Sequence, residues 1–284
     1  MVYRLGQILL ASLHYNKNSI MKTKKIVSFL CIAVFCITQF SCKKDKSEPA
    51  PVTKKYLPTA IAEQKTSTSA PIYNISFTYN KDASLSSITQ ASTSRTITWS
   101  LNYNANGSLN TASQSESGSS PKNVSYVFSY GANDKLNKVV SSGSVTDVLN
   151  LNYNAATNTY GGSGGTYDGV SLRLNTAGQV DNIQDWTIFQ VDMNLVYQSD
   201  KKGVFADVNM DESVKVFLNI YNNFPVAFSF FHSQEVTRTT FGTNNYLYQN
   251  YNRNADKYIS TYQVDRSASS TNYPRSYTVS YTEQ

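Results

Sequence analysis

The chain has 284 residues, with 25 Lys and Arg, 19 Asp and Glu, and a formal net charge of +6 at pH 7. Charged residues make up 15% of it, which is too few for a coiled coil or a charged disordered tail. A hydrophobic fraction of 40% argues against wholesale disorder. The length fits one large all-β domain or at most two small domains.

The positive charge comes from the first 55 residues. Residues 1–41 contain five basic residues and no acidic residue, and five more lysines lie between residues 42 and 55. From Tyr56 onward, 15 basic residues stand against 17 acidic residues. Because this part of the chain is nearly neutral, it lacks the charge pattern of a surface that binds phosphates. We therefore expect no nucleic-acid partner.

Residues 21–41 have the three-part pattern of a secretory signal peptide. Met21 opens a lysine-rich start, an uncharged and mostly apolar run follows from Ile26 to Thr38, and Ser41 stands before Cys42. The apolar run is short for a permanent transmembrane helix, which is the alternative interpretation. Residues 1–20 precede this complete signal and carry no motif. We interpret them as a misassigned start, with a genuine N-terminal extension as the alternative.

Cys42 is the predicted lipidation site. Cys31 and Cys36 lie inside the leader and no cysteine follows Cys42, which excludes an intramolecular disulfide framework in the mature chain. The segment resembles a bacterial lipoprotein signal, in which a small residue precedes a lipidated cysteine that becomes the mature N-terminus. Gln39 and Phe40 depart from the usual pattern. The resemblance implies that acyl chains attach the protein to a membrane, and two or more chains would hold it firmly.

Residues 42–55 form a predicted flexible tether. The segment from Lys43 to Pro51 is polar and contains two prolines, as expected of a solvated linker. The residues around Cys42, followed by such a linker, resemble outer-membrane lipoproteins of the Bacteroidetes. This resemblance implies a lipid-anchored location at the outer membrane, on either the periplasmic or the cell-surface face.

Residues 56–284 are expected to form a single all-β domain of repeated hairpins. Four segments alternate apolar and polar residues and end on a tyrosine, which is the period of a strand with one buried face. These segments are residues 75–79, 99–103, 126–130 and 149–153. Turns rich in Asn, Asp, Gly and Ser follow. A three-residue apolar spacing after the turns, as in Leu85 and Ile88, predicts a β-bulge near each turn.

One stretch departs from this pattern. Val214, Phe217, Leu218 and Tyr221 fall at helical spacing, and the Asn-Asn-Phe-Pro sequence at 222–225 stops the run. We expect one short helix or crossover around residues 204–221. It would plug one end of a large curved antiparallel sheet or barrel-like roll.

Two resemblances support this fold. The unit of a tyrosine, a turn and Leu-x-x-Ile, at residues 79–88 and 130–139, resembles a degenerate tyrosine–aspartate (YD) repeat of the RHS type. Residues 56–284 resemble an uncharacterised family of Bacteroidetes lipoproteins described as having a porin-like β fold. That second resemblance rests on the repeated strands, the Lys-Lys-Gly stretch at 201–203 and the tyrosine-rich C-terminal segment. It implies a curved antiparallel sheet or barrel-like roll and brings no catalytic residues.

The aromatic residues have two interpretations. Tyrosines along a concave sheet can form a stacking platform for sugar rings, or they can be core residues. Because the strand tyrosines share a face with Phe77 and Leu101, we favour the core. Trp186 lies outside the repeat register and close to Asp181 and Asp185, so these three residues are a speculative ligand-binding set.

A calcium loop is considered at residues 207–211. Asp207, Asn209 and Asp211 alternate as the first oxygen ligands of such a loop do. Glu212 replaces the turn glycine, however, and Leu218 stands where the bidentate glutamate is required. A solvated loop is preferred, and we expect neither a metal ion nor a cofactor.

The sequence contains few residues in patterns that indicate catalysis. His232 is the only histidine after the leader, and we expect it on a strand. The sequence contains no Gly-x-Ser-x-Gly turn, which would carry a nucleophilic serine. The glycine-rich run 161–165 is expected to be a flexible loop. Two close carboxylate pairs, at 181/185 and 211/212, are the features that suggest a glycosidase. Closeness in sequence does not set the distance between two carboxylates that this mechanism needs. We therefore predict no catalytic residue.

The sequence thus favours a non-catalytic cell-envelope lipoprotein, acting as a structural or binding module. The alternative is a surface glycan- or protein-binding lipoprotein that uses exposed aromatics, and a remote alternative is a glycoside hydrolase. The expected partner is the membrane, through Cys42, and a binding role would add a glycan or an envelope protein.

Overall fold

The computed structural model describes residues 54–67, 70–185, 191–221, 231–267 and 274–284. The predicted signal peptide, Cys42 and most of the tether therefore lie outside the described residues. Within the described chain, residues 54–284 form one compact unit. No helix among the described residues is long and apolar enough to cross a bilayer.

The described residues form sixteen strands. They are β1 (Tyr56–Lys65), β2 (Ala70–Tyr79), β3 (Leu85–Ala91), β4 (Thr96–Tyr103), β5 (Leu109–Ser117), β6 (Lys122–Tyr130), β7 (Leu136–Gly143), β8 (Asp147–Asn154), β9 (Thr159–Ser163), β10 (Ser171–Leu174), β11 (Val180–Asp185), β12 (Val191–Lys202), β13 (Gln234–Phe241), β14 (Asn244–Arg253), β15 (Ile259–Arg266) and β16 (Arg275–Glu283). A 3-10 turn, η2 (Gly165–Tyr167), and one helix, α2 (Glu212–Tyr221), complete the described elements.

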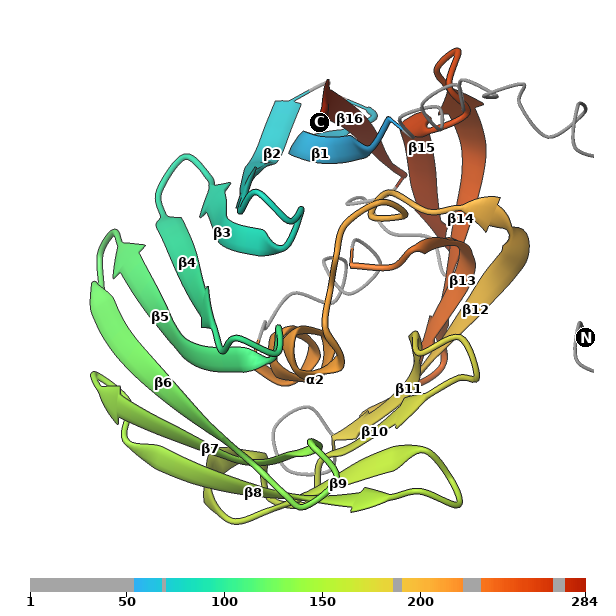
Figure 1. Cartoon of the computed structure of the whole chain (residues 1–284). Helices are drawn as coiled ribbons and strands as arrows, with labels where there is room; N and C mark the ends of the chain where they lie inside the picture. The colour runs from blue at the N-terminus through green and yellow to red at the C-terminus, as the bar shows by residue number, and fades with distance from the viewer. Residues whose placement is uncertain (1–53, 68–69, 186–190, 222–230, 268–273) are drawn as a thin grey trace, which may run out of the picture. The chain divides into compact units, whose positions relative to one another are not determined.

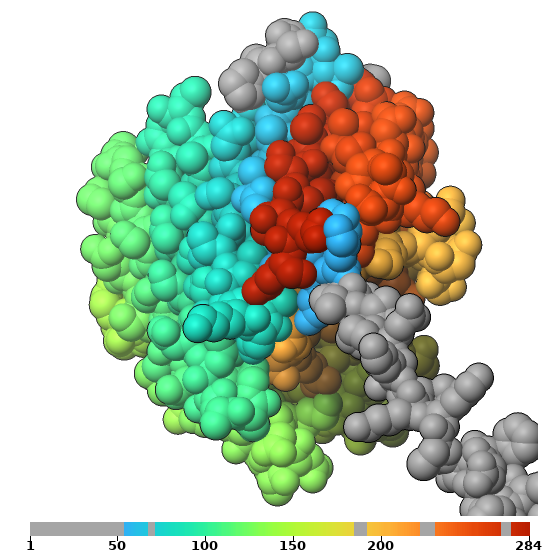
Figure 2. All heavy atoms as spheres, turned by 45° about the horizontal axis from the view of Figure 1, so that its top comes forward, coloured from blue at the N-terminus to red at the C-terminus, as the bar shows by residue number. Residues whose placement is uncertain are grey.

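The sheet closes into an antiparallel barrel. Every strand pairs with the next one in sequence, and β1 pairs with β16 from Tyr56↔Glu283 to Lys65↔Arg275. The first strands and the last strands therefore lie side by side (Figures 1 and 2). The expected all-β class with a barrel-like sheet and one short helix is confirmed, and the sheet is fully closed.

The strands form because apolar residues alternate with polar ones. In β6, Val124, Tyr126 and Phe128 are buried in the barrel, whereas the residues between them are exposed. One core cluster joins the inward residues of the strands with the helix α2. The hydrophobic core therefore occupies the interior of the barrel.

The predicted bulges are present beside the turns. Tyr79 pairs with Leu85 and Thr78 pairs with Ser87, which leaves Ser86 as the extra residue. The same register shift occurs at the turn ends of the pairs β4–β5, β6–β7, β10–β11 and β14–β15. Because each of these turns joins an even-numbered strand to the following odd-numbered one, all lie at the same end of the barrel. We call this end the near rim; β1 begins there and β16 ends there.

The repeated tyrosines belong to the core, as favoured from the sequence. Five strand tyrosines, three of which end a strand, pack against the core and donate their hydroxyl to a backbone carbonyl of the preceding strand. These bonds join Tyr79 to Pro58 (2.6 Å), Tyr103 to Leu85 (2.5 Å), Tyr130 to Leu109 (2.6 Å), Tyr197 to Val180, and Tyr251 to Val236. The hydroxyls thus connect successive hairpins near the rim.

The helix α2 lies inside the ring of strands (Figure 1). Its Phe217 is fully buried, with its ring 5.5 Å from that of Trp99, 5.0 Å from Tyr126 and 4.8 Å from Phe128. The helix occupies the second part of the expected span 204–221, and the Asp211 carboxylate caps its start by accepting the backbone N–H of Ser213 at 2.8 Å. It fills the interior of the barrel.

Two local expectations are wrong. The glycine run 161–165 is not simply a flexible loop: Gly161 to Ser163 belong to β9, and Gly162 packs closely against Val170 and Leu149. His232 is not on a strand; it lies two residues before β13, buried beside the ring of Tyr197. In both cases tertiary packing decides the local structure.

Candidate functional site

The structure describes only part of the speculative ligand-binding set. Asp181 is the bulge residue at the start of β11, where its carboxylate pairs with the Arg173 guanidinium at 2.8 Å. Asp185 ends β11, but its side chain is outside the described part of the structure, and so is Trp186. The described residues therefore place Asp181 alone of the three.

Asp181 belongs to a polar cluster on the outer wall of β10–β12. Asn182, opposite Arg173, donates its amide to Asp192 at 2.7 Å and to Asn194 at 2.8 Å. Hydrogen bonding to Asp181, followed by the charges of Asp181 and Asp192, raises the pKa of Arg173 above its usual range. We call these five residues, 173, 181, 182, 192 and 194, the outer polar cluster. It brings amide, guanidinium and carboxylate groups together on the outer wall, where Asn182 is 9% exposed and lies beneath its partners.

The residues of the rejected calcium loop have other roles. Asp207 accepts a hydrogen bond from the backbone N–H of Tyr56 at 2.9 Å, and Asp211 caps α2. Asn209 donates its backbone N–H to the Ala83 carbonyl at 3.0 Å. These contacts connect the loop to the near rim and to the helix.

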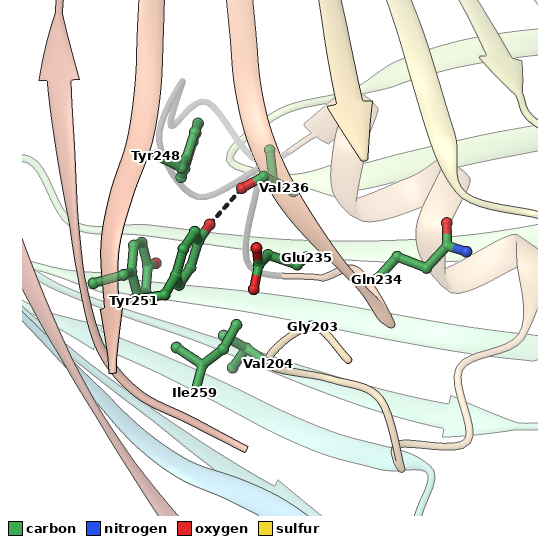
Figure 3. Close-up of a pocket in the computed structure, with 9 residues that line it drawn as sticks. Gly203, Val204, Gln234, Glu235, Val236, Tyr248, Tyr251 and Ile259 are labelled. Carbon is green, nitrogen blue, oxygen red and sulfur yellow. Dashed lines mark hydrogen bonds between the residues drawn. The ribbon is translucent and has the colours of Figure 1, made fainter. Parts of the chain in front are cut away.

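A small cleft lies in the barrel interior beside β13, β14 and β15 (Figure 3). Its volume is about 240 Å³ with its open mouth included, and its enclosed space is about that of one water molecule. The lining residues are Gly203, Val204, Gln234, Glu235, Val236, Tyr248, Tyr251, Ile259 and Tyr262. The cleft is too small to enclose a sugar ring.

The cleft adjoins a buried ion pair. The Glu235 side chain is only 4% exposed, and its carboxylate accepts a hydrogen bond from Arg253. Arg253 also donates to the Lys257 carbonyl at 2.6 Å. Burial raises the pKa of the Tyr251 hydroxyl above its usual range, and that hydroxyl donates to the Val236 carbonyl. These polar groups satisfy one another and hold β13 and β14 together.

A second buried ion pair joins the first strand to the last. Glu63 of β1 is 4% exposed and accepts a hydrogen bond from Arg275 of β16. Burial raises the pKa of the Glu63 carboxyl, although the charge and hydrogen bond of Arg275 oppose this shift. Next to this pair the rings of Tyr262 and Tyr277 stack at 4.7 Å. The interior is therefore polar and aromatic near the closure of the barrel.

The expectations from the sequence do not include these inward charges, although the strand pattern indicates one of them. Glu63 stands two residues after Ile61, so the strand period places both on the same, buried face. The same argument applied to each strand would have marked Glu63 as an inward charge that needs a partner.

Comparisons with known proteins give distant structural likenesses only. No family model matches the chain, and no curated protein matches it. A solved porin-like protein from Bacteroides uniformis superposes with a TM-score of 0.39 at 11% identity, covering 81% of this chain and 97% of the other. A porin-like protein from Bacteroides vulgatus gives a TM-score of 0.36 at 10% identity, covering 80% and 99%. The architecture described above follows from the strand pairing of this chain itself.

Proposed function

We propose that the protein is a non-catalytic lipoprotein of the cell envelope whose barrel stands in water, tethered to the outer membrane through Cys42. The single observation that carries this proposal is the polarity of the two faces of the barrel wall. The inward face is a mainly apolar core cluster, in which the described acids Glu63 and Glu235 are paired with arginines, and the outward face of β2–β7 is polar. A membrane-spanning barrel requires the opposite arrangement, with an apolar band facing lipid and often a polar interior.

The outer wall of β2–β7 carries rows of hydroxyl groups. Cross-strand pairing places six such residues side by side around the barrel. They are Thr78, Ser87, Ser100, Ser113, Ser125 and Ser142. All six are exposed or half-exposed. Hydroxyls that face outward at this density are expected to contact water, because unpaired polar groups are costly in hydrocarbon.

The interior leaves no room for a pore along α2. Phe217, Val214 and Leu218 of the helix are fully buried and belong to the same core cluster as the strands. A barrel filled in this way is a rigid body suited to a structural or binding role. Three of the four carboxylates that suggested a glycosidase have other partners. Asp211 caps α2, Glu212 pairs with Lys135 at 2.8 Å, and Asp181 pairs with Arg173 at 2.8 Å.

The tether is tested by changing its cysteine. Cys42→Ser should release the protein from the membrane fraction into the soluble fraction, because the barrel itself would hold no lipid-facing band. Cys36→Ser, a matched change inside the leader, should leave the protein membrane-bound and acylated. Incorporation of a fatty-acid analogue followed by mass spectrometry gives the modified residue. A Cys42→Ser protein that still resists extraction from the membrane overturns the proposal.

A glycan-binding role is the second candidate, and the outer polar cluster favours it. None of the described tyrosines is fully exposed, so these rings do not supply the exposed aromatic platform. The cluster instead offers Arg173, Asn182 and Asp192 on the outer wall, close in sequence to Trp186. A protein of residues 42–284 should bind a glycan on a glycan array. The Asn182→Ala variant should lose this binding, and the Ser113→Ala variant should keep it. Absence of any retention removes this candidate.

A further inference from the structure

The carboxylate of Asp207 lies where the first strand begins. Its Oδ2 atom accepts the backbone N–H of Tyr56 at 2.9 Å and the hydroxyl of Tyr258 at 2.5 Å. Lys202 contacts its Oδ1 atom at 3.4 Å and donates to the Tyr258 hydroxyl at 2.6 Å. The Asp207 side chain is 15% exposed, so these charge-assisted bonds are largely shielded from water.

Apart from Asp207, the contacts at this end of β1 are the packing of the Tyr56 ring 4.8 Å from the ring of Tyr258, backbone pairing with β16, and side-chain contacts at the surface. The Lys55 and Gln284 backbones exchange hydrogen bonds of 3.3 and 2.9 Å. Lys54 pairs with Glu283 at 2.9 Å, but both side chains are about half exposed or more, so water screens the pair. A pull on Lys54 would therefore load the first β1–β16 pair, Tyr56↔Glu283, before the rest of the strand.

Asp207 belongs to a segment that is bonded around the whole near rim. We call residues 203–221 the plug segment. Its polar bonds reach the β2–β3 turn, the start of β5, the β6–β7 turn, β9 and the β10–β11 turn. The bonds are Asn209 N–H to Ala83 O (3.0 Å), Leu109 N–H to Ser213 Oγ (3.0 Å), Lys135 Nζ to Glu212 (2.8 Å), Tyr160 Oη to Glu212, and Lys215 Nζ to Gly178 O (2.8 Å).

We propose that Asp207 is a mechanical clasp: it connects Tyr56, where the tether enters the barrel, to the plug segment. Tension on the tether then acts on several carboxylate bonds at once and is distributed to five other parts of the rim. The physiological use of the clasp rests on the proposed lipid tether. The resistance of the Asp207 bonds to force does not depend on the lipid tether, because it can be measured on an unlipidated chain.

The clasp is tested by pulling on single molecules of residues 42–284. Because Cys42 is the only cysteine of this chain, it serves as one attachment point, and Ser119→Cys in the exposed β5–β6 hairpin at the opposite rim supplies the other. Asp207→Ala should make rupture at constant force roughly tenfold faster, the effect expected when hydrogen bonds to one carboxylate are lost. Asp200→Ala, which removes an exposed carboxylate of β12, is the matched control and should leave the rate unchanged.

A second pulling direction separates a clasp from a general stabiliser. In a Cys42→Ser chain, attachment at Asn106→Cys and Thr146→Cys applies the load away from Tyr56. Asp207→Ala should leave the rupture rate unchanged in this direction. Equal acceleration in both directions, or none along the tether, overturns the proposal. Asp207→Asn, which keeps the side-chain shape, gives the same test with a smaller acceleration if the alanine variant does not fold.

Discussion

At the residue scale, the strand-end tyrosines have two roles that the sequence alone does not separate. Their rings pack against the core, while their hydroxyls bond to backbone carbonyls of earlier strands. Burial raises the pKa of the Tyr103 hydroxyl above its usual range, so it remains a neutral donor over the whole physiological pH range.

Removal of one such hydroxyl should destabilise the barrel measurably. Tyr103→Phe keeps the ring but leaves the Leu85 carbonyl without this donor, so we expect the free energy of unfolding to fall by about 1–2 kcal/mol. Urea unfolding followed by tyrosine fluorescence measures the change. Ser113→Ala, which removes an outward hydroxyl, should have almost no effect. Equal effects of both substitutions would show that the hydroxyl bond adds nothing to stability.

Gly203 permits the chain to leave β12 and enter the barrel. A Cβ atom at this position would lie 2.5 Å from the His232 carbonyl oxygen and would also collide with the Gln234 carbonyl oxygen. Gly203→Ala should therefore lower the free energy of unfolding by about 3 kcal/mol, as overpacking against rigid backbone does. Gly131→Ala is the control, since its Cβ would meet nothing closer than 3.8 Å. The same urea midpoint for both variants would contradict this prediction.

Asp207 should also make the free energy of unfolding depend on pH in the acid range. Burial alone would raise its pKa, but the bonds from Tyr258 and Tyr56 and the charge of Lys202 outweigh burial and lower it. A lowered pKa in the folded state means that the stabilisation is present above the usual aspartate range and is lost as the pH falls below it. The difference in urea midpoint between wild type and Asp207→Asn should shrink between pH 6 and about pH 3. A difference that stays constant across this range would be incompatible with the assignment.

At the scale of elements, α2 should contribute strongly to the core. Phe217→Ala removes a fully buried ring that contacts Trp99, Tyr126 and Phe128, so we expect a loss of about 3–5 kcal/mol. Calorimetry or urea unfolding gives the value. Leu247→Ala, at a position 44% exposed on β14, should cost far less. If the two variants are equally stable, the helix is not packed inside the barrel as described.

The strands were predictable because their signals are local. The alternation that ends at Tyr79 and the apolar spacing from Leu85 to Ile88 predict a strand, a turn and a bulge, all of which the structure confirms. The closure between β1 and β16 could not be predicted in this way. It joins Tyr56 to Glu283, and no local pattern encodes a pairing between residues so far apart.

The candidate site was less predictable than the fold. Asp181 was selected for its closeness to Trp186, but its described partner is Arg173 on the neighbouring strand. Asp192 and Asn194 of β12 were not selected, since only strand pairing brings them beside Asn182. The start of α2 at Glu212 depends on the Asp211 cap, a short signal that the helical spacing of apolar residues does not contain.

At the scale of the whole molecule, the two faces of the barrel wall differ in polarity. Inward residues form one continuous core with α2, and the outward rows on β2–β7 are mainly hydroxyl groups. The proposed function follows from this polarity: the barrel stands in water, and the lipidated tether before Lys54 attaches it to the membrane.

The most direct test is the behaviour of residues 54–284 without detergent. We expect a monomer in sedimentation velocity, a circular dichroism spectrum dominated by strands, and no flotation with phospholipid vesicles. A fragment that stays in solution only with detergent and floats with the vesicles would contradict this expectation, because its outer wall would then face lipid.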